Sequence, residues 1–340
     1  MGQGNETVVT EFILEGFSGL NQRLQLFLSL VFLLIYLTTV MGNATIIFLV
    51  CVDNRLQIPM YFFIGNLAFL EICFTSCTSI KLLVILSSGR RTISVSACFV
   101  QSYFYFALGC KEFILLVVMS FDRYLAICQP LRYAAIMTQQ LCILLVVAAW
   151  VAGFTFMSYH LVLLSKLTFC GSNKIQHFFC DNSPLFQLSC SDTNLLWRID
   201  SVLILFILLA SLCLTLSSYV CILFCILRMP SRRKKAFATC SSHLTSLAIA
   251  FGSCLDLYSH PSERVSLETN KLVALLNTVL YPFLNPFIYS LRNKLVVLVL
   301  KDAIAHATAQ LFPQSRCISG QQFELSVIVP NAARAVGHTM

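Results

Sequence analysis

Charged side chains are scarce in this sequence. They make up 11% of its 340 residues, whereas hydrophobic residues make up 58%. A water-soluble globule with so much apolar material would need more polar side chains to cover its surface. The composition therefore excludes a soluble globular protein and indicates a membrane protein. The net charge of +8 requires no nucleic-acid partner, because charge asymmetry across a membrane accounts for most of it.

A catalytic constellation is also missing. The histidines are scattered along the chain, and no Ser/His/Asp or metal-ligand spacing falls within one pocket. We therefore expect neither an enzyme nor a protein that carries a cofactor or a catalytic metal.

Long apolar runs are abundant by contrast. Six uncharged runs are long enough to cross a bilayer as helices, and a further run is interrupted only by Glu71. Helices are favoured because a backbone exposed to lipid must satisfy its own hydrogen bonds. The runs are 24–52, 60–80, 92–110, 133–165, 201–227, 236–255 and 272–291. These runs predict an all-α membrane protein with seven transmembrane helices.

The orientation follows from the distribution of Lys and Arg. The densest basic cluster, Arg232–Lys235, lies in a short loop, and such loops are cytoplasmic. Seven spans then place the N-terminus outside and the C-terminus in the cytoplasm. Asn5-Glu6-Thr7 fits the N-glycosylation pattern on the required side, and the first twenty residues lack the features of a cleavable signal peptide.

The third predicted helix carries a polar stripe. Tyr105, Glu112 and Arg123 share one face, because their separations correspond to whole turns at about 100° per residue. Lys111 is turned about 100° away from that stripe. Two interpretations of Lys111 stay open: a lysine that pairs locally or snorkels, or a determinant of ligand specificity.

Most of the sixteen cysteines fall in the apolar runs or at their inner ends, where thiols act as small apolar side chains. Four lie on the predicted outer side, where disulfides form, namely Cys98, Cys170, Cys180 and Cys190. Four cysteines allow three pairings, and the spacing alone does not choose among them.

Several motifs occur in an order typical of one family. Met119–Cys128, which contains Asp122-Arg123-Tyr124, resembles the end of the third helix in rhodopsin-like G-protein-coupled receptors. Asn66–Glu71 and Pro282–Tyr289 resemble the signatures of helices two and seven. Pro130–Tyr133 and Lys235–Thr245 resemble the odorant receptors in particular. The resemblance covers about residues 5–300.

The resemblance implies a multi-pass odorant receptor of the plasma membrane. Such a receptor binds a small, mostly apolar volatile odorant among helices three, five, six and seven. It activates a stimulatory heterotrimeric G protein of the olfactory type and raises cyclic AMP. The resemblance also implies disulfides between Cys98 and Cys180 and between Cys170 and Cys190.

Three groups of functional residues are expected on this basis. The ligand pocket comprises Tyr105, Phe106, Gly109, Cys110, Ile204, Ile207, Phe251, Cys254, Leu255, Tyr258, Leu275 and Thr278. The activation switch comprises Asp122, Arg123, Tyr124, Tyr219, His243, Asn285, Pro286 and Tyr289. A candidate cation site, or a pair of carboxylates that shares a proton, comprises Asn43, Glu71, Glu112 and Asn285.

The chain departs from the odorant-receptor pattern at Phe121, Arg132 and Ala134, which bears on the strength of coupling. Two other functional classes require different sequence features. A secondary transporter should show paired broken helices in two related halves, and these are not seen. A rhodopsin-like receptor for a non-odorant small molecule in a non-olfactory tissue remains the alternative, although an amine receptor would need an acid near Tyr105.

The expected organisation has four parts. Residues 1–23 form an extracellular N-terminus with a glycan at Asn5, and residues 24–293 form the receptor domain. Residues 294–309 form an interfacial cytoplasmic helix in contact with membrane lipid, and residues 310–340 form a disordered cytoplasmic tail.

Overall fold

The computed structural model describes most of the chain. The described residues are 9–228, 240, 243–252, 254, 267–291 and 293–311. The chain forms two compact units, Met1–Asn293 and Lys294–Met340, and we describe each by itself.

Six helical segments of the described residues are long and apolar enough to cross a membrane. They are α1 (Gln22–Val52), α2 (Pro59–Ser88), α3 (Val95–Cys128), α5 (Gln139–Leu164), α7 (Asn194–Leu227) and a composite segment, Lys271–Tyr289. The composite segment runs through α9 (Leu267–Leu275), a π-helical turn η3 (Leu276–Leu280) and α10 (Tyr281–Leu291). A shorter apolar helix, His243–Gly252, lies within the sixth predicted run, and we call it the sixth-run helix. The seven-helix membrane fold expected from the sequence is confirmed.

The helix ends follow from local sequence. Asn21, Ser94 and Thr138 each accept a hydrogen bond from a backbone amide in the first turn of α1, α3 and α5, over 2.8 to 3.3 Å. Pro59 begins α2, where its missing N–H costs nothing. Gly89 ends α2 with φ +69°, a conformation that a residue with a Cβ rarely adopts.

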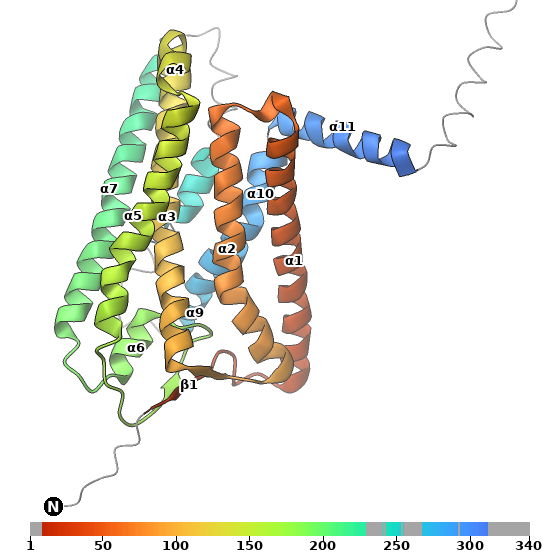
Figure 1. Cartoon of the computed structure of the whole chain (residues 1–340). Coiled ribbons are helices and arrows are strands. Elements are labelled where there is room, and N and C mark those ends of the chain that lie inside the picture. Colours follow the sequence, from red (N-terminus) through yellow and green to blue (C-terminus); the bar gives the residue numbers. More distant parts are fainter. Residues whose placement is uncertain are drawn as a thin grey trace, which may run out of the picture. The chain divides into compact units, whose positions relative to one another are not determined.

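Helix α3 is the centre of the receptor unit. It packs against α2, α5 and α7, whereas α1 packs against α2 and α10 (Figure 1). Of the most apolar part of α3, 72% is buried, compared with 11% for α1. Side chains on α3 therefore reach most of the bundle interior, which explains why the predicted polar stripe lies there.

Two predicted boundaries were wrong. The fourth span does not begin at 133, because α4 (Pro130–Ile136) is a separate short helix and α5 begins at Gln139. The break occurs because Thr138 caps α5 and cannot continue the helix before it. The fifth span begins at Asn194 rather than 201, so Arg198 belongs to its first turns and not to a loop.

A small β-sheet was not expected. Strands β2 (Thr92–Ser94), β1 (Glu11–Leu14) and β3 (Lys174–Ile175) form it in that spatial order. β1 is antiparallel to β2 and parallel to β3, and the buried Phe12 and Leu14 of β1 form an apolar core with Ile175. The sheet lies at the end of the bundle opposite α4 (Figure 1), and we call these the sheet end and the α4 end.

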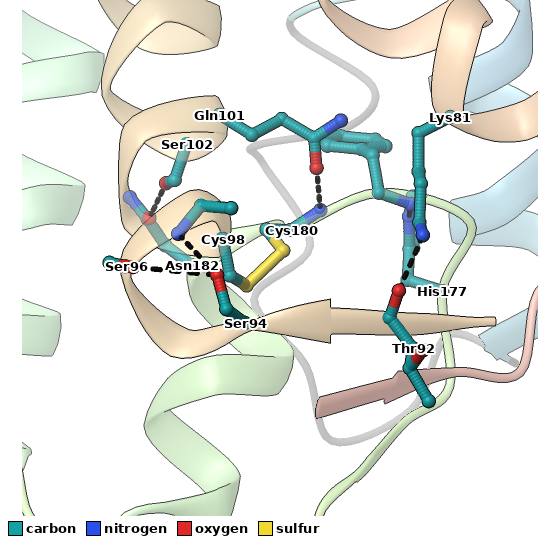
Figure 2. The surroundings of a disulfide bond; sticks show 12 residues. Lys81, Thr92, Ser94, Ser96, Cys98, Gln101, Ser102, His177, Cys180 and Asn182 are labelled. Carbon is teal, nitrogen blue, oxygen red and sulfur yellow. Dashed lines mark hydrogen bonds between the residues drawn. A yellow bond between two sulfur atoms is a disulfide. The ribbon is translucent and has the colours of Figure 1, made fainter. Parts of the chain in front are cut away.

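Two disulfides hold the loop between α5 and α7 at the sheet end. Cys98 at the start of α3 is bonded to Cys180, and Cys170 is bonded to Cys190 within the loop. These are the two pairs that the resemblance implied. Figure 2 shows how Gln101 adds to the first link, since its side-chain oxygen accepts a hydrogen bond of 3.1 Å from the backbone N–H of Cys180.

The second unit contains α11 (Lys294–Leu311). A helix was predicted there over 294–309. Asn5, Asp256, the basic cluster 232–235 and the tail after 311 lie outside the described residues.

Candidate functional site: an apolar cavity and the polar core beneath it

A cavity of about 70 Å³ lies within the receptor unit, beside the middle of α3. Its walls come from α2, α3, α5, α7, the sixth-run helix, η3 and α10. The residues that line it are Phe74, Tyr105, Phe106, Gly109, Cys110, Glu112, Phe113, Met157, Ile204, Ile207, Leu208, Ala250, Cys254, Asn277 and Tyr281. Most of these side chains are apolar, so a molecule held there would be bound mainly by burial and shape.

Seven of the twelve predicted pocket residues line this cavity. They are Tyr105, Phe106, Gly109, Cys110, Ile204, Ile207 and Cys254. Phe251 does not line the cavity but packs behind Phe113, with the two ring centroids 5.1 Å apart. Leu255 and Tyr258 lie outside the described residues.

Leu275 and Thr278 do not line the cavity. Leu275 borders a separate groove beside Phe32 of α1, and Thr278 is fully buried with its carbonyl oxygen bonded to Thr75 of α2. The π-helical turn η3 changes the helical register at this point, so an assignment based on regular α-helical spacing selects the wrong face.

The polar residues that line the cavity are Tyr105, Glu112, Asn277 and Tyr281. Asn277 is buried, and its side-chain nitrogen has no hydrogen-bond partner among the described residues. An unpaired buried amide costs free energy unless a partner arrives, so Asn277 is a ready donor to a polar atom of a ligand. The sequence carried one signal for this pair: Asn277 and Tyr281 are four residues apart in an apolar run.

The loop between α5 and α7, residues 165–193, reaches the cavity wall, and we call it the lid. The ring of Phe179 lies 4.7 Å from that of Tyr105, which lines the cavity. Phe179 directly precedes Cys180, so the disulfide to α3 also holds this ring in place.

The same loop contains two titratable groups with shifted pKa values, the buried His177 and the half-buried Asp181. Burial, together with the charge of Lys271, lowers the pKa of His177 to about 3. Burial and the nearby Asp200 carboxylate raise the pKa of Asp181 to about 6. His177 is therefore neutral at pH 7, whereas Asp181 takes up a proton near pH 6.

A polar core lies beneath the cavity. The Asn285 amide nitrogen donates a hydrogen bond to Glu71 Oε1, and Asn285 Oδ1 accepts one of 3.2 Å from Ser246. The Ser246 hydroxyl also lies 3.2 Å from the hydroxyl of Tyr281. These contacts connect α2, the sixth-run helix and α10.

The two predicted carboxylates interact across this core. Glu71 is fully buried and Glu112 is 6% exposed, and the charge of the Glu112 carboxylate acts on Glu71. Glu71 Oε2 has no hydrogen-bond partner among the described residues. An orphaned, buried carboxylate oxygen fits a bound cation or a proton, as the sequence suggested.

Asn43 lies next to the point where α1 and α10 approach each other. A Cβ on Gly42 would lie 3.1 Å from Pro286 Cβ, so this approach requires a residue without a side chain. Asn43 donates a hydrogen bond of 3.0 Å to the Thr39 carbonyl of its own helix. Its bond therefore stays within α1.

The α4 end holds the Asp-Arg pair. Arg123 and Asp122 form a salt bridge of 2.8 Å, and Asp122 accepts a second bond, of 2.7 Å, from the Tyr133 hydroxyl of α4. Burial and the Asp122 charge raise the pKa of Tyr133, which keeps its hydroxyl protonated as a donor. Tyr133 belongs to the Pro130–Tyr133 motif, but the motif does not indicate its bond to Asp122.

A second contact at this end joins two other predicted switch residues. The Tyr219 hydroxyl on α7 lies 2.6 Å from His243 Nδ1 on the sixth-run helix. Of the remaining members, Tyr124 accepts a bond from Gln129 and packs in one apolar cluster with Tyr219, and Pro286 and Tyr289 lie on α10.

Lys111 points away from the cavity. It is 1% exposed, and its Nζ lies 2.8 Å from the ring centroid of Trp150 on α5. The contact is a cation–π pair with a neighbouring helix, and it agrees with the interpretation of Lys111 as a lysine that pairs locally. Trp150 therefore does more than pack, because its ring faces a cation.

An apolar seven-helix bundle with a mostly apolar cavity among its helices and an Asp-Arg pair at the α4 end defines a seven-transmembrane receptor. Comparison with known proteins narrows the class. A model of the olfactory receptor family matches residues 32–308. The chain is 48% identical to mouse olfactory receptor 6E1 over 88% of this chain and 97% of that protein. It is 48% identical to human olfactory receptor 6J1, over 88% and 87%, and 46% identical to human olfactory receptor 6C3, over 88% and 97%.

The chain belongs to the olfactory receptor family. It is accordingly a multi-pass plasma-membrane receptor for odorants that couples to a G protein, and it is not an enzyme.

Proposed function

We propose that this receptor binds a small, mostly apolar volatile odorant in the cavity beside α3, with its N-terminus outside the cell. The supporting observation is the lining of the cavity, in which mostly aliphatic and aromatic side chains surround a few polar groups. A ligand would gain free energy from burial of its apolar surface and would form one or two hydrogen bonds with Asn277 or Tyr281.

The ligand signal reaches the α4 end through shared helices. Phe113 of the cavity wall packs in one apolar cluster with Leu116 on α3, Leu208 on α7 and Leu247 on the sixth-run helix. A ligand that shifts this cluster acts on the helices that carry Tyr219 and His243. The partner there is a stimulatory G protein of the olfactory type, and its activation raises cyclic AMP.

A sodium ion fits the polar core between the two carboxylates. Glu71 and Glu112 would hold it, because the second oxygen of Glu71 is unpaired among the described residues. The bound charge would offset the repulsion between the carboxylates and favour the receptor state whose core is open.

The test is a cyclic AMP reporter assay of the full chain, co-expressed with the olfactory stimulatory G protein, against a broad odorant panel. Gly109 lies on the cavity wall, with its nearest neighbour, Phe74, 3.9 Å from the position of an added Cβ. Gly109→Leu should fill the cavity and change the odorant response at least tenfold. Gly252→Leu is the matched control, because Gly252 is exposed and has no atom within 4 Å of an added Cβ.

Two results would contradict the proposal. One is a complete lack of cyclic AMP response to the panel at normal surface expression. The other is an equal response of wild type and Gly109→Leu to every active odorant.

A further inference from the structure

A further concave site lies on the lipid-facing surface of the bundle. It is a groove of about 690 Å³ between α2, α3 and α5, and it shares no lining residue with the odorant cavity. Phe69 on α2 is 49% exposed there and Phe104 on α3 is 42% exposed. In a spanning bundle such a surface faces the lipid, so a molecule can enter it directly from the bilayer.

The groove runs along the helices from the sheet end toward the middle of the bundle. Ala97 and Leu108 lie near its two ends on α3, a separation of about 16 Å at 1.5 Å per residue. Its length along one helix is therefore suited to an extended chain.

The deep end of the groove is rigid. The ring of Trp150 lies 5.8 Å from those of Phe69 and Phe154, and Lys111 lies against it as well. Near this point α3 and α5 are almost in contact, since a Cβ on Gly153 would lie 2.7 Å from the Ala107 carbonyl oxygen. The aromatic floor is therefore built into the helix packing and is not a transient gap.

The mouth of the groove carries a cation. On α2 the groove is lined by Phe69, Cys73 and Cys77, and the next residue on that face is Lys81. Its Nζ donates a hydrogen bond of 2.6 Å to the Thr92 carbonyl, next to Ile93, which also lines the groove (Figure 2).

No carboxylate forms a salt bridge with Lys81 in the part of the chain that the structure describes. Two further cations, Arg90 and Arg91, follow in the turn between α2 and β2. The charge at the mouth is therefore positive and open to an anionic group.

We propose that this groove binds the anion of a long-chain fatty acid from the bilayer. The carboxylate pairs with Lys81 at the mouth, and the single alkyl chain lies along Phe104 and Leu108 and ends against Trp150. Lipid tails are as apolar as the groove, so burial alone gives little preference for any lipid. The charge at the mouth and the fit of one chain supply the selectivity.

The experiment uses the purified full-length receptor in nanodiscs at pH 7.4 and palmitic acid with a diazirine at the end of its chain. Labelling should fall on α2, α3 or α5 close to Trp150 and should be competed by unlabelled palmitate. Lys81→Gln should weaken binding about tenfold, because it removes a charge-assisted hydrogen bond, and Lys81→Arg should retain most of it. Ala97→Trp should block labelling by filling the mouth.

Arg198→Gln is the matched control, because Arg198 is an exposed cation near the start of α7, away from the groove. It should leave labelling unchanged. Labelling that is unaffected by both Lys81→Gln and Ala97→Trp would overturn the proposal. Equal labelling by a fatty alcohol probe, or competition by a sterol but not by palmitate, would also overturn it.

Discussion

The Nζ atom of Lys111 lies 2.8 Å from the ring centroid of Trp150, where α3 packs against α5 within the membrane-spanning bundle. The side chain is 1% exposed, and its nitrogen has no hydrogen-bond partner among the described residues. A cation in this position is costly, and the face of an indole ring offsets part of the cost. Lys111 and Trp150 should therefore depend on each other for stability.

This coupling can be measured by thermal unfolding of the purified receptor. Lys111→Met should raise the apparent melting temperature, because an apolar side chain of similar length replaces a buried charge. Trp150→Leu should lower it by the equivalent of about 2 kcal/mol, since it leaves the cation without the ring. In the Lys111→Met background the same Trp150 change should cost clearly less; additive effects of the two changes would refute the coupling.

The bond between Tyr219 and His243 should restrain basal signalling. Tyr219→Phe removes the hydroxyl and the 2.6 Å bond between α7 and the sixth-run helix. We expect basal cyclic AMP to rise severalfold, because a bond of about 1 kcal/mol that forms only in the inactive state shifts the equilibrium by that factor. The measurement is reporter activity without odorant, normalised to surface expression.

Tyr36→Phe is the control for that experiment. It removes a comparable hydroxyl bond, of 3.1 Å to Ser76, between α1 and α2. Basal activity should not change. A similar rise in both variants, or no rise in Tyr219→Phe, would mean that the Tyr219 bond does not hold the inactive state.

Sodium should act through the carboxylate pair. In the wild type, basal cyclic AMP should fall as sodium replaces a large organic cation at constant ionic strength. Glu112→Gln removes one carboxylate charge from the core and should abolish this dependence. Identical sodium responses in the two proteins, at equal surface expression, would show that one acid simply carries a proton.

The lid should respond to pH with two opposite contributions. His177 has a pKa of about 3 in the folded lid and about 6.5 when unfolded, so its burial destabilises the lid progressively as the pH falls below 6.5. Between pH 7.5 and 5.5 this amounts to about 1.4 kcal/mol. Asp181 has a pKa raised to about 6, so protonation restores stability over the same range, by about 0.8 kcal/mol.

The apparent melting temperature of the purified receptor at pH 7.5 and 5.5 tests both signs. The wild type should be less stable at pH 5.5. His177→Gln should reverse this difference, because it removes the opposing contribution and leaves that of Asp181, and Asp181→Asn should enlarge it. A change of the same sign in both variants would be inconsistent with these assignments.

Features that depend on neighbouring residues in the chain were accessible from the sequence. Apolar runs of spanning length predicted the bundle, because a helix in lipid satisfies its own backbone and needs no distant partner. The motifs around Asp122-Arg123-Tyr124 and Asn285-Pro286 indicated the family. The caps that separate α4 from α5 were present in the sequence, but the apolar run across Thr138 concealed them.

Features that depend on the rotation and meeting of helices came only from the tertiary structure. Leu275 and Thr278 were expected in the cavity, but the π-helical turn at 276–280 puts Asn277 and Tyr281 there instead. The partner of Lys111 is Trp150, 39 positions away on another helix. The sequence by itself determined which segments cross the membrane, because that choice is local; tertiary packing decided which side chains meet, because each pairing depends on the rotation of two helices at once.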